Sequence, residues 1–195
     1  MVTQPAYLKN LKTYARTQFG DADQSEAIIA DFDAESDRGA IILAATGIED
    51  TIEFRLGLMM PVLEKDASAR AEVFGARGCM GTYADKILMA YALGIIDERG
   101  RRDIDLVREI RNACAHCRLP ISLSVPELQA AVKAALGPEM LREIKDHEPR
   151  TLRVAFIVHC ATVVGYVATG KRRSPTETAE AYAQGELLAS SGRRA

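Results

Sequence analysis

Apolar residues recur every three or four positions along most of the chain, the spacing that places them on one face of an α-helix. The longest such segment runs from Ser36 or Asp37, either of which can cap a helix, to Met60, and Pro61 ends it. Its apolar side chains gather on one face at about 100° per residue: Ile41, Ala45, Ile48, Ile52, Leu56 and Met59. The pattern predicts a long helix with one buried face.

Four further segments have the same period and end at glycine, proline or a polar turn: 82–94, Asp103 to His116, Ser122 or Ser124 to Leu136, and 151–169. The segment 82–94 is apolar on most sides, so it is predicted to be the central and most buried helix. Residues 65–81 are predicted to be a loop and residues 97–102 a charged turn. No segment alternates like a strand, so the sequence predicts an all-α protein, a helical bundle of about five core helices.

The chain of 195 residues suffices for one domain of ordinary size. Residues 36–170 contain the strong helical segments and are predicted to be the helical domain. Residues 1–35 are predicted to be an N-terminal helical extension, with a short helix over 3–18 and a weaker, acidic one over 21–34. Residues 171–195 are predicted to be a basic linker and a C-terminal tail.

The composition is that of a globular protein, with 48% hydrophobic and 27% charged residues. The net charge of −2 argues against a protein that coats nucleic acid, although a local basic patch stays open. No secretion signal is visible, and the apolar run 154–167 is interrupted by polar residues and short for a bilayer span. We therefore expect a cytoplasmic protein with no membrane partner and with reduced cysteines.

The cysteines and histidines offer a metal site as one interpretation. Cys114 and Cys117 form a C-x-x-C pair, and His159 and Cys160 are adjacent elsewhere. A zinc knuckle normally uses a second such pair, which this chain lacks, and no βαβ pattern surrounds the motif as in a redox protein. Both cysteines of the pair fall on an apolar helix face, so packing is favoured. The sequence predicts no metal and no cofactor, and His147 and His159 are expected to be structural.

Two charged residues fall on predicted buried faces. Glu49 lies inside the apolar arc of the long helix, and Arg111 lies on or beside the apolar face of the helix 103–116. Each needs a partner, since an unpaired buried charge is strongly destabilising. The pair is either a structural ion pair that joins two helices or an anion-binding arginine held by the glutamate. Spacing alone favours the structural pair.

Asn112 and His116 are four residues apart and share a helix face. Arg111 and His116 are five apart, which turns them about 140° away from each other on a regular helix. Both could contact one phosphate if the helix ended near Ala115, if Arg111 reached round, or if a second subunit brought its own copy of the motif. The plainer interpretation of His116 is a helix-terminal residue that interacts favourably with the helix dipole.

Three blocks of the sequence resemble one known family: Asp37 to Ala45 and on through Glu53, Lys86 to Ile96, and Ile110 to His116. They are similar to the mannitol operon repressor family over about residues 36–125. That family belongs with the HEPN superfamily of small helical bundles, whose signature is an arginine, a polar residue, a few further residues and a histidine. Arg111, Asn112 and His116 match this signature, so the resemblance implies an HEPN-like fold.

In active HEPN proteins the motif lies at a dimer interface and cuts RNA without a metal. The resemblance therefore implies that His116 assists attack by a ribose 2′-hydroxyl, that Arg111 holds the phosphate, and that Asn112 positions the two. Such an attack needs a base that works near neutral pH and a cation beside the developing phosphorane charge. Our first hypothesis is a homodimeric, metal-independent endoribonuclease, as a toxin or defence component with RNA and an antitoxin as partners.

The alternative is a non-catalytic transcriptional regulator that resembles the mannitol operon repressor and acts through protein or nucleic-acid partners. The chain has no helix-turn-helix or zinc-finger signature for reading DNA directly. A third hypothesis is a structural dimer in which Arg111 and Glu49 only lock the core. Weaker candidates for nucleic-acid binding are the basic residues at predicted helix ends: Arg99, Arg101, Arg102, Lys171, Arg172 and Arg173.

Overall fold

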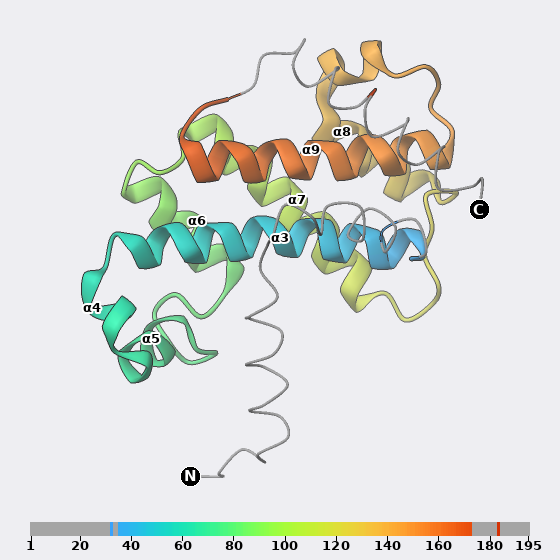
Figure 1. Ribbon diagram of the computed structural model, residues 1–195. Helices are drawn as coiled ribbons and strands as arrows, with labels where there is room; N and C mark the ends of the chain where they lie inside the picture. Colours follow the sequence, from blue (N-terminus) through green and yellow to red (C-terminus); the bar gives the residue numbers. More distant parts are fainter. Residues whose placement is uncertain (1–31, 33–34, 173–182, 184–195) are drawn as a thin grey trace, which may run out of the picture.

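The computed structural model describes residues 32, 35–172 and 183, which form seven α-helices and no strand (Figure 1). The all-α prediction is confirmed. The helices are α3 (Asp37–Leu58), α4 (Pro61–Lys65), α5 (Ala67–Phe74), α6 (Tyr83–Ala92), α7 (Glu98–His116), α8 (Pro126–Glu143) and α9 (Pro149–Thr169). The predicted extension 1–35 and tail 171–195 lie almost entirely outside the described residues.

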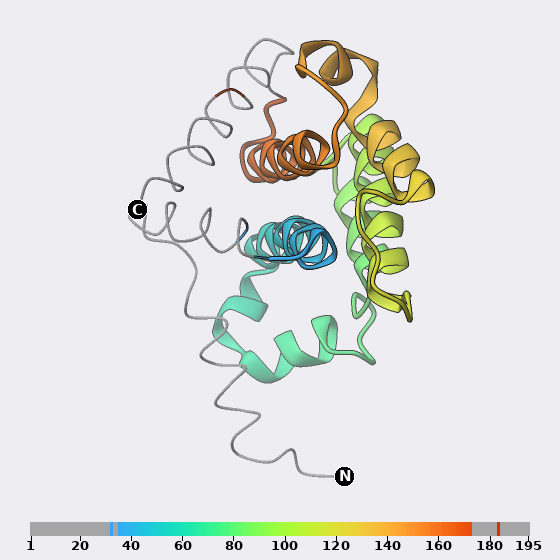
Figure 2. The same ribbon diagram turned by 90° about the vertical axis from the view of Figure 1, so that its right-hand side faces the viewer.

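The core is built around α3, which packs against α9, α7 and α6. In Figure 2, α3 and α9 lie next to each other, and α7 and α8 run along one side of this pair. Four large side chains of α3 are fully buried: Ile41, Ile48, Ile52 and Leu56. On α9, Leu152 and Phe156 are also completely buried. The apolar face predicted for the long helix is therefore the centre of the molecule.

The prediction that residues 82–94 form the most buried helix is wrong. In α6, Leu88 is 52% exposed and Tyr91 is 37% exposed. Among the described helices, α6 packs mainly against α3 and α7, so the side of α6 that faces away from both has no helix over it. An apolar residue on a helix is compatible with the surface as well as the core, because much of a folded protein's surface is apolar.

The segment 65–81 is also more ordered than predicted. Asp66 caps α5, because its carboxylate accepts the backbone N–H groups of Ser68 and Ala69 at 2.9 and 3.0 Å. The long helix α3 ends at Leu58, and Met59, which was predicted to lie on its buried face, is 51% exposed. The chain turns there because Pro61 begins the next short helix. Only the glycine-rich stretch after α5 remains a loop.

The predicted charged turn at 97–102 is the first turn of α7. Asp97 caps this helix by accepting the backbone N–H of Gly100 at 2.6 Å. A hydrogen bond from Arg172, and then the one from Gly100, hold the pKa of the Asp97 carboxyl well below its usual range. The predicted break at Gly137 is confirmed, since its φ of 74° kinks α8, which continues beyond the kink to Glu143.

The helix α9 is longer than the apolar run noted in the sequence. It has 21 residues, and its most apolar window has a mean hydropathy of 1.6, so by length and composition it could cross a membrane. In the structure, 44% of that window is buried, and the helix packs against α3 and α8. A core helix passes the same test of length and hydropathy, so the cytoplasmic location stays a prediction.

Candidate functional site

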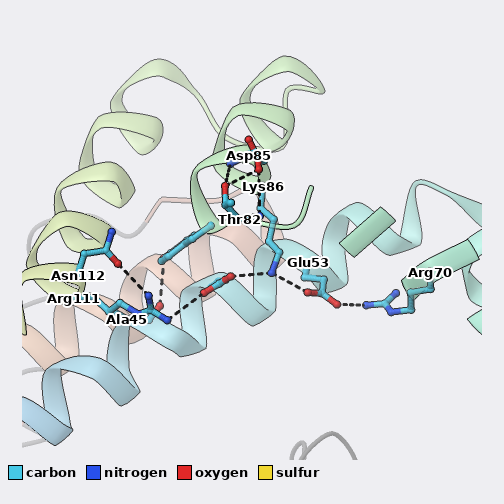
Figure 3. A network of polar contacts seen from close by, with 10 residues as sticks. Ala45, Glu53, Arg70, Thr82, Asp85, Lys86, Arg111 and Asn112 are labelled. Atoms are coloured by element: carbon cyan, nitrogen blue, oxygen red, sulfur yellow. Dashed lines mark hydrogen bonds and ion pairs between the residues drawn. The ribbon is translucent and has the colours of Figure 1, made fainter. Parts of the chain in front are cut away.

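The three residues of the signature lie on the last two turns of α7. The core face of this helix is buried, and Arg111 and Asn112 lie at its edge, half-buried, while His116 is exposed. Arg111 Nη1 donates a hydrogen bond to Asn112 Oδ1 at 3.0 Å, a contact visible in Figure 3. Asn112 therefore orients the guanidinium of its neighbour. The imidazole of His116 is therefore open to solvent in one chain.

The predicted approach of Glu49 to Arg111 is confirmed, but at the long end of an ion pair. Arg111 Nη2 lies 4.0 Å from Glu49 Oε2, and their side chains are 31% and 16% exposed. This distance is too long for a hydrogen bond. Arg111 Nε is buried and has no hydrogen-bond partner among the described residues. The guanidinium thus keeps donors that no described side chain uses.

The closer partner of Glu49 is Lys86, which the sequence pattern did not single out. Lys86 lies on α6, is 5% exposed, and its Nζ lies 2.8 Å from Glu49 Oε1 and 3.0 Å from Glu53 Oε2. Burial by itself would lower the pKa of Lys86, but the hydrogen bonds to Glu49 and Glu53 outweigh it and raise the pKa. The lysine is therefore a charged ammonium in the core. A lysine within a mostly apolar helix was the signal in the sequence.

The contacts continue to α5, where Arg70 Nη2 binds Glu53 Oε1 at 2.9 Å. Figure 3 shows the resulting row of polar side chains. Arg70, Glu53 and Lys86 lie toward one end of it, and Arg111 and its neighbour Asn112 lie at the other end. Three of the five linked charged side chains are cationic and two are anionic. Counted over these five described side chains, the network has one positive charge in excess, and Arg111 has the longest ion-pair distance among them.

The C-terminal end of α7 is tied to α3 by a residue outside the predicted site. Arg38 Nη2 donates to the carbonyl oxygen of Ala115 at 2.9 Å, and so satisfies one of the carbonyls left free at a helix end. The helix stays regular to its end, since the N–H of Cys117 bonds to the carbonyl of Ala113. The helix ends at His116, one residue after Ala115, without loosening before it. Within one chain, Arg111 and His116 point about 140° apart and lie about 7.5 Å apart along the axis.

The C-x-x-C pair divides between the core and the helix end. Cys114 is fully buried, and burial raises the pKa of its thiol, as expected for a packing residue. Cys117 is half-buried and follows the last helical residue, so only one of the two cysteines lies on the core face. Both thiols are free. Within the described ranges, no three His, Cys, Asp or Glu side chains are grouped so that they could hold a metal ion.

The weaker candidates lie at the other end of α7 and are mostly ion-paired. Arg172 contacts Asp97 at 2.6 Å and Asp103 at 3.3 Å, and its guanidinium lies 4.3 Å from the ring centre of Tyr166. Arg99, Arg101 and Arg102 each lie within 4.0 Å of an acidic residue one helical turn away. Lys171 is exposed, and Arg173 lies outside the described residues. The structure does not bring these residues together with the signature, which is about 15 Å further along the helix.

A pocket of about 300 Å³ lies at that same end, between α7, α8 and α9. His159 lines it, its Nε2 is buried and has no hydrogen-bond partner among the described residues, and burial lowers its pKa. The third histidine, His147, is exposed and contacts the carbonyl of Leu141. None of Arg111, Asn112 and His116 lines the pocket. The signature and the pocket are therefore separate features.

Comparisons of the chain with protein-family models, with curated proteins and with solved structures found no match. The structure itself defines an all-α helical bundle. Its candidate site is an arginine–asparagine pair near an exposed histidine on the same helix.

Proposed function

We propose that this protein is a homodimeric, metal-independent endoribonuclease of the HEPN type, with Arg111, Asn112 and His116 as its catalytic residues. The observation that carries the proposal is the state of Arg111. Its guanidinium is oriented by Asn112 at 3.0 Å, lies 4.0 Å from the carboxylate of Glu49, and belongs to a network that has one positive charge in excess when the described residues are counted. A guanidinium in this state suits a phosphate, which accepts hydrogen bonds from two of its nitrogens.

The residues fit a transphosphorylation step. One histidine removes the proton of the ribose 2′-hydroxyl, the 2′-oxygen bonds to phosphorus, and the bond to the 5′-oxygen breaks. A second histidine delivers a proton to the leaving 5′-oxygen, so the products are a 2′,3′-cyclic phosphate and a 5′-hydroxyl. Histidine suits both roles because it gains and loses a proton near neutral pH. Arg111 stabilises the charge that develops on the phosphorane oxygens.

A dimer supplies the geometry that one chain lacks. Arg111 and His116 of the same copy point in different directions around α7. A two-fold interface that includes the end of α7 would place His116 of one copy near Arg111 of the other, and would bring two histidines to one phosphate. The accessible position of His116 leaves room for such an arrangement.

The second candidate function is a non-catalytic regulator that acts through a protein partner. It is favoured by the ion pairing of Arg99, Arg101, Arg102 and Arg172, because acidic partners already neutralise these four candidates for contact with a nucleic-acid backbone. Under this hypothesis, the Arg111 network would serve mainly to connect α7, α3 and α6.

Purified protein incubated with single-stranded RNA and EDTA tests the proposal. We expect cleavage that leaves 2′,3′-cyclic phosphate ends, and loss of cleavage in His116→Ala with a nearly unchanged thermal melt, since an exposed side chain contributes little to stability. His147→Ala is the matched control, because this histidine is also exposed, and it should cut like the wild type. Intact RNA after incubation with a folded wild-type protein would favour the regulator.

A further inference from the structure

Lys86 occupies the middle of the charge network without belonging to the signature (Figure 3). It comes from α6, whereas Arg111 and Asn112 come from α7 and Glu49 from α3. It lies between two carboxylates, with Glu49 at 2.8 Å and Glu53 at 3.0 Å. Lys86 is therefore the only described residue that links the carboxylate beside Arg111 to the rest of the network.

The two carboxylate oxygens of Glu49 lie at different distances from two cations. Its Oε1 accepts a direct hydrogen bond from Lys86 at 2.8 Å, whereas its Oε2 lies 4.0 Å from Arg111. Electrostatic attraction falls with distance, and the direct hydrogen bond adds to it, so Lys86 is the main partner. Glu53 has a second cation in Arg70 at 2.9 Å, whereas the cations that contact Glu49 within the described part of the chain are Lys86 and Arg111. Removing Lys86 would therefore leave Glu49 to pair with Arg111 alone.

An arginine and a carboxylate that are left together in a half-buried site form a close, two-bond pair. In that arrangement, the nitrogens of Arg111 that could contact a phosphate would be occupied by Glu49. We propose that Lys86 is a positioning residue for phosphate binding: it holds Glu49 and thereby keeps the guanidinium of Arg111 available to the phosphodiester of single-stranded RNA. This inference rests on the proposed function, because it assumes that Arg111 binds the RNA phosphate.

The inference differs from a purely structural role in what a second substitution does. If Lys86 only joins α3 to α6, then changing Glu49 as well as Lys86 leaves the defect in place or adds to it. If Lys86 acts through Glu49, then replacing Glu49 by glutamine removes the competing charge, and Arg111 is free again. The single change Glu49→Gln is informative too, because Arg111 is oriented by Asn112 and has no hydrogen bond to Glu49.

The test measures binding of a fluorescent single-stranded oligoribonucleotide whose 2′-hydroxyls are methylated, so that it cannot be cut, by fluorescence anisotropy. We expect Lys86→Met to weaken binding at least about tenfold, the effect of losing one charged hydrogen bond. Glu49→Gln and the double variant Glu49→Gln/Lys86→Met should bind within about threefold of the wild type. Lys86→Arg should retain binding, and Lys145→Met, which removes an exposed charge elsewhere, is the control for net charge.

Two results would overturn the inference about Lys86. A double variant that binds as weakly as Lys86→Met overturns the inference, as does a Glu49→Gln variant that loses binding while its thermal melt is unchanged. The Glu49→Gln result stands even if Lys86→Met fails to fold. Arg111→Ala separates the two proposals: if it binds the oligonucleotide as well as the wild type does, or if the wild type does not bind, the proposed function fails. If Arg111→Ala loses binding and Lys86→Met does not, only the role of Lys86 is wrong.

Discussion

The two ends of α7 both carry arginines, but they pair them differently. At the N-terminal end, Arg102 and Glu98 form an exposed pair one helical turn apart, and Arg172 is held by Asp97. At the C-terminal end, Arg111 lies 4.0 Å from the carboxylate of Glu49, and Arg38 of α3 donates to the backbone carbonyl of Ala115. It follows that the number of arginines at a helix end does not predict where an anion can bind. What matters is whether each guanidinium is already neutralised.

Arg111→Ala should have the largest effect on activity. Loss of the cation beside the phosphorane is expected to reduce RNA cleavage by about 10²–10³-fold, measured as initial rates in EDTA. Stability should change little, because Lys86 still pairs with Glu49 at 2.8 Å. If Arg111 were the sole partner of Glu49, as the sequence pattern alone indicates, the substitution would leave Glu49 buried and unpaired and the loss would be larger. A large fall in the melting temperature would show that Arg111 is part of the structural lock.

Lys86→Met should have the largest effect on stability, about 2 kcal/mol in the free energy of unfolding by urea denaturation. The ammonium is 5% exposed and bonds to two carboxylates, so its removal costs two close ion pairs in the interior, and leaves Glu49 with Arg111 and Glu53 with Arg70 as partners. The matched change at the other end of α7, Arg102→Ala in an exposed pair, should cost much less. Equal losses in the two variants would contradict the contrast between the ends of α7.

Asp97→Asn should have a smaller effect that depends on pH. The pKa of Asp97 in the folded protein lies below its unfolded value, so its charge stabilises the fold above pH of about 4 and this contribution is lost as the pH falls further. Asparagine also caps helices, so the substitution removes the charge and keeps the cap. The side chain is 58% exposed, so we expect a loss below about 1 kcal/mol at pH 7. Urea denaturation at pH 7 and pH 3 should show the gap to wild type closing at the lower pH.

Arg102→Ala should have the smallest effect. Arg102 and Glu98 are 69% and 70% exposed, and exposed pairs of this kind contribute at most about 0.5 kcal/mol. RNA cleavage should stay within about twofold of the wild type, since this end of α7 lies about 15 Å from the signature. A strong loss of cleavage in Arg102→Ala would mean that the RNA extends along α7, and would end the distinction between its two ends.

Local signals in the sequence predicted most helices because caps and breakers act on neighbouring residues. Ser36 caps α3 as expected, with its hydroxyl accepting the N–H of Gly39, and Gly137 breaks α8. The same kind of signal was missed at Asp66 and Asp97, where an aspartate begins a helix in a segment that reads as loop or turn. Both could have been predicted, because aspartate is among the favoured capping residues.

The site was predictable only in part. Helical periodicity placed Glu49 and Arg111 on faces that meet, since a buried charge on each of two amphipathic helices requires a partner. Periodicity could not show that Lys86 comes closer to Glu49 than Arg111 does. That order depends on how α6 packs between its neighbours, and the sequence spacing between 49 and 86 contains no information about it.

By itself, the amino-acid sequence determined the all-α class, the long helix with its apolar face, and the presence of Arg111, Asn112 and His116 near one helix end. These features follow from interactions between residues a few positions apart. The packing of the helices places α6 at the edge of the core. It also makes Lys86, at 2.8 Å, the close partner of Glu49, while Arg111 lies 4.0 Å from it. The physical reason is that a charge chooses its partner by distance in space, and helix packing sets that distance.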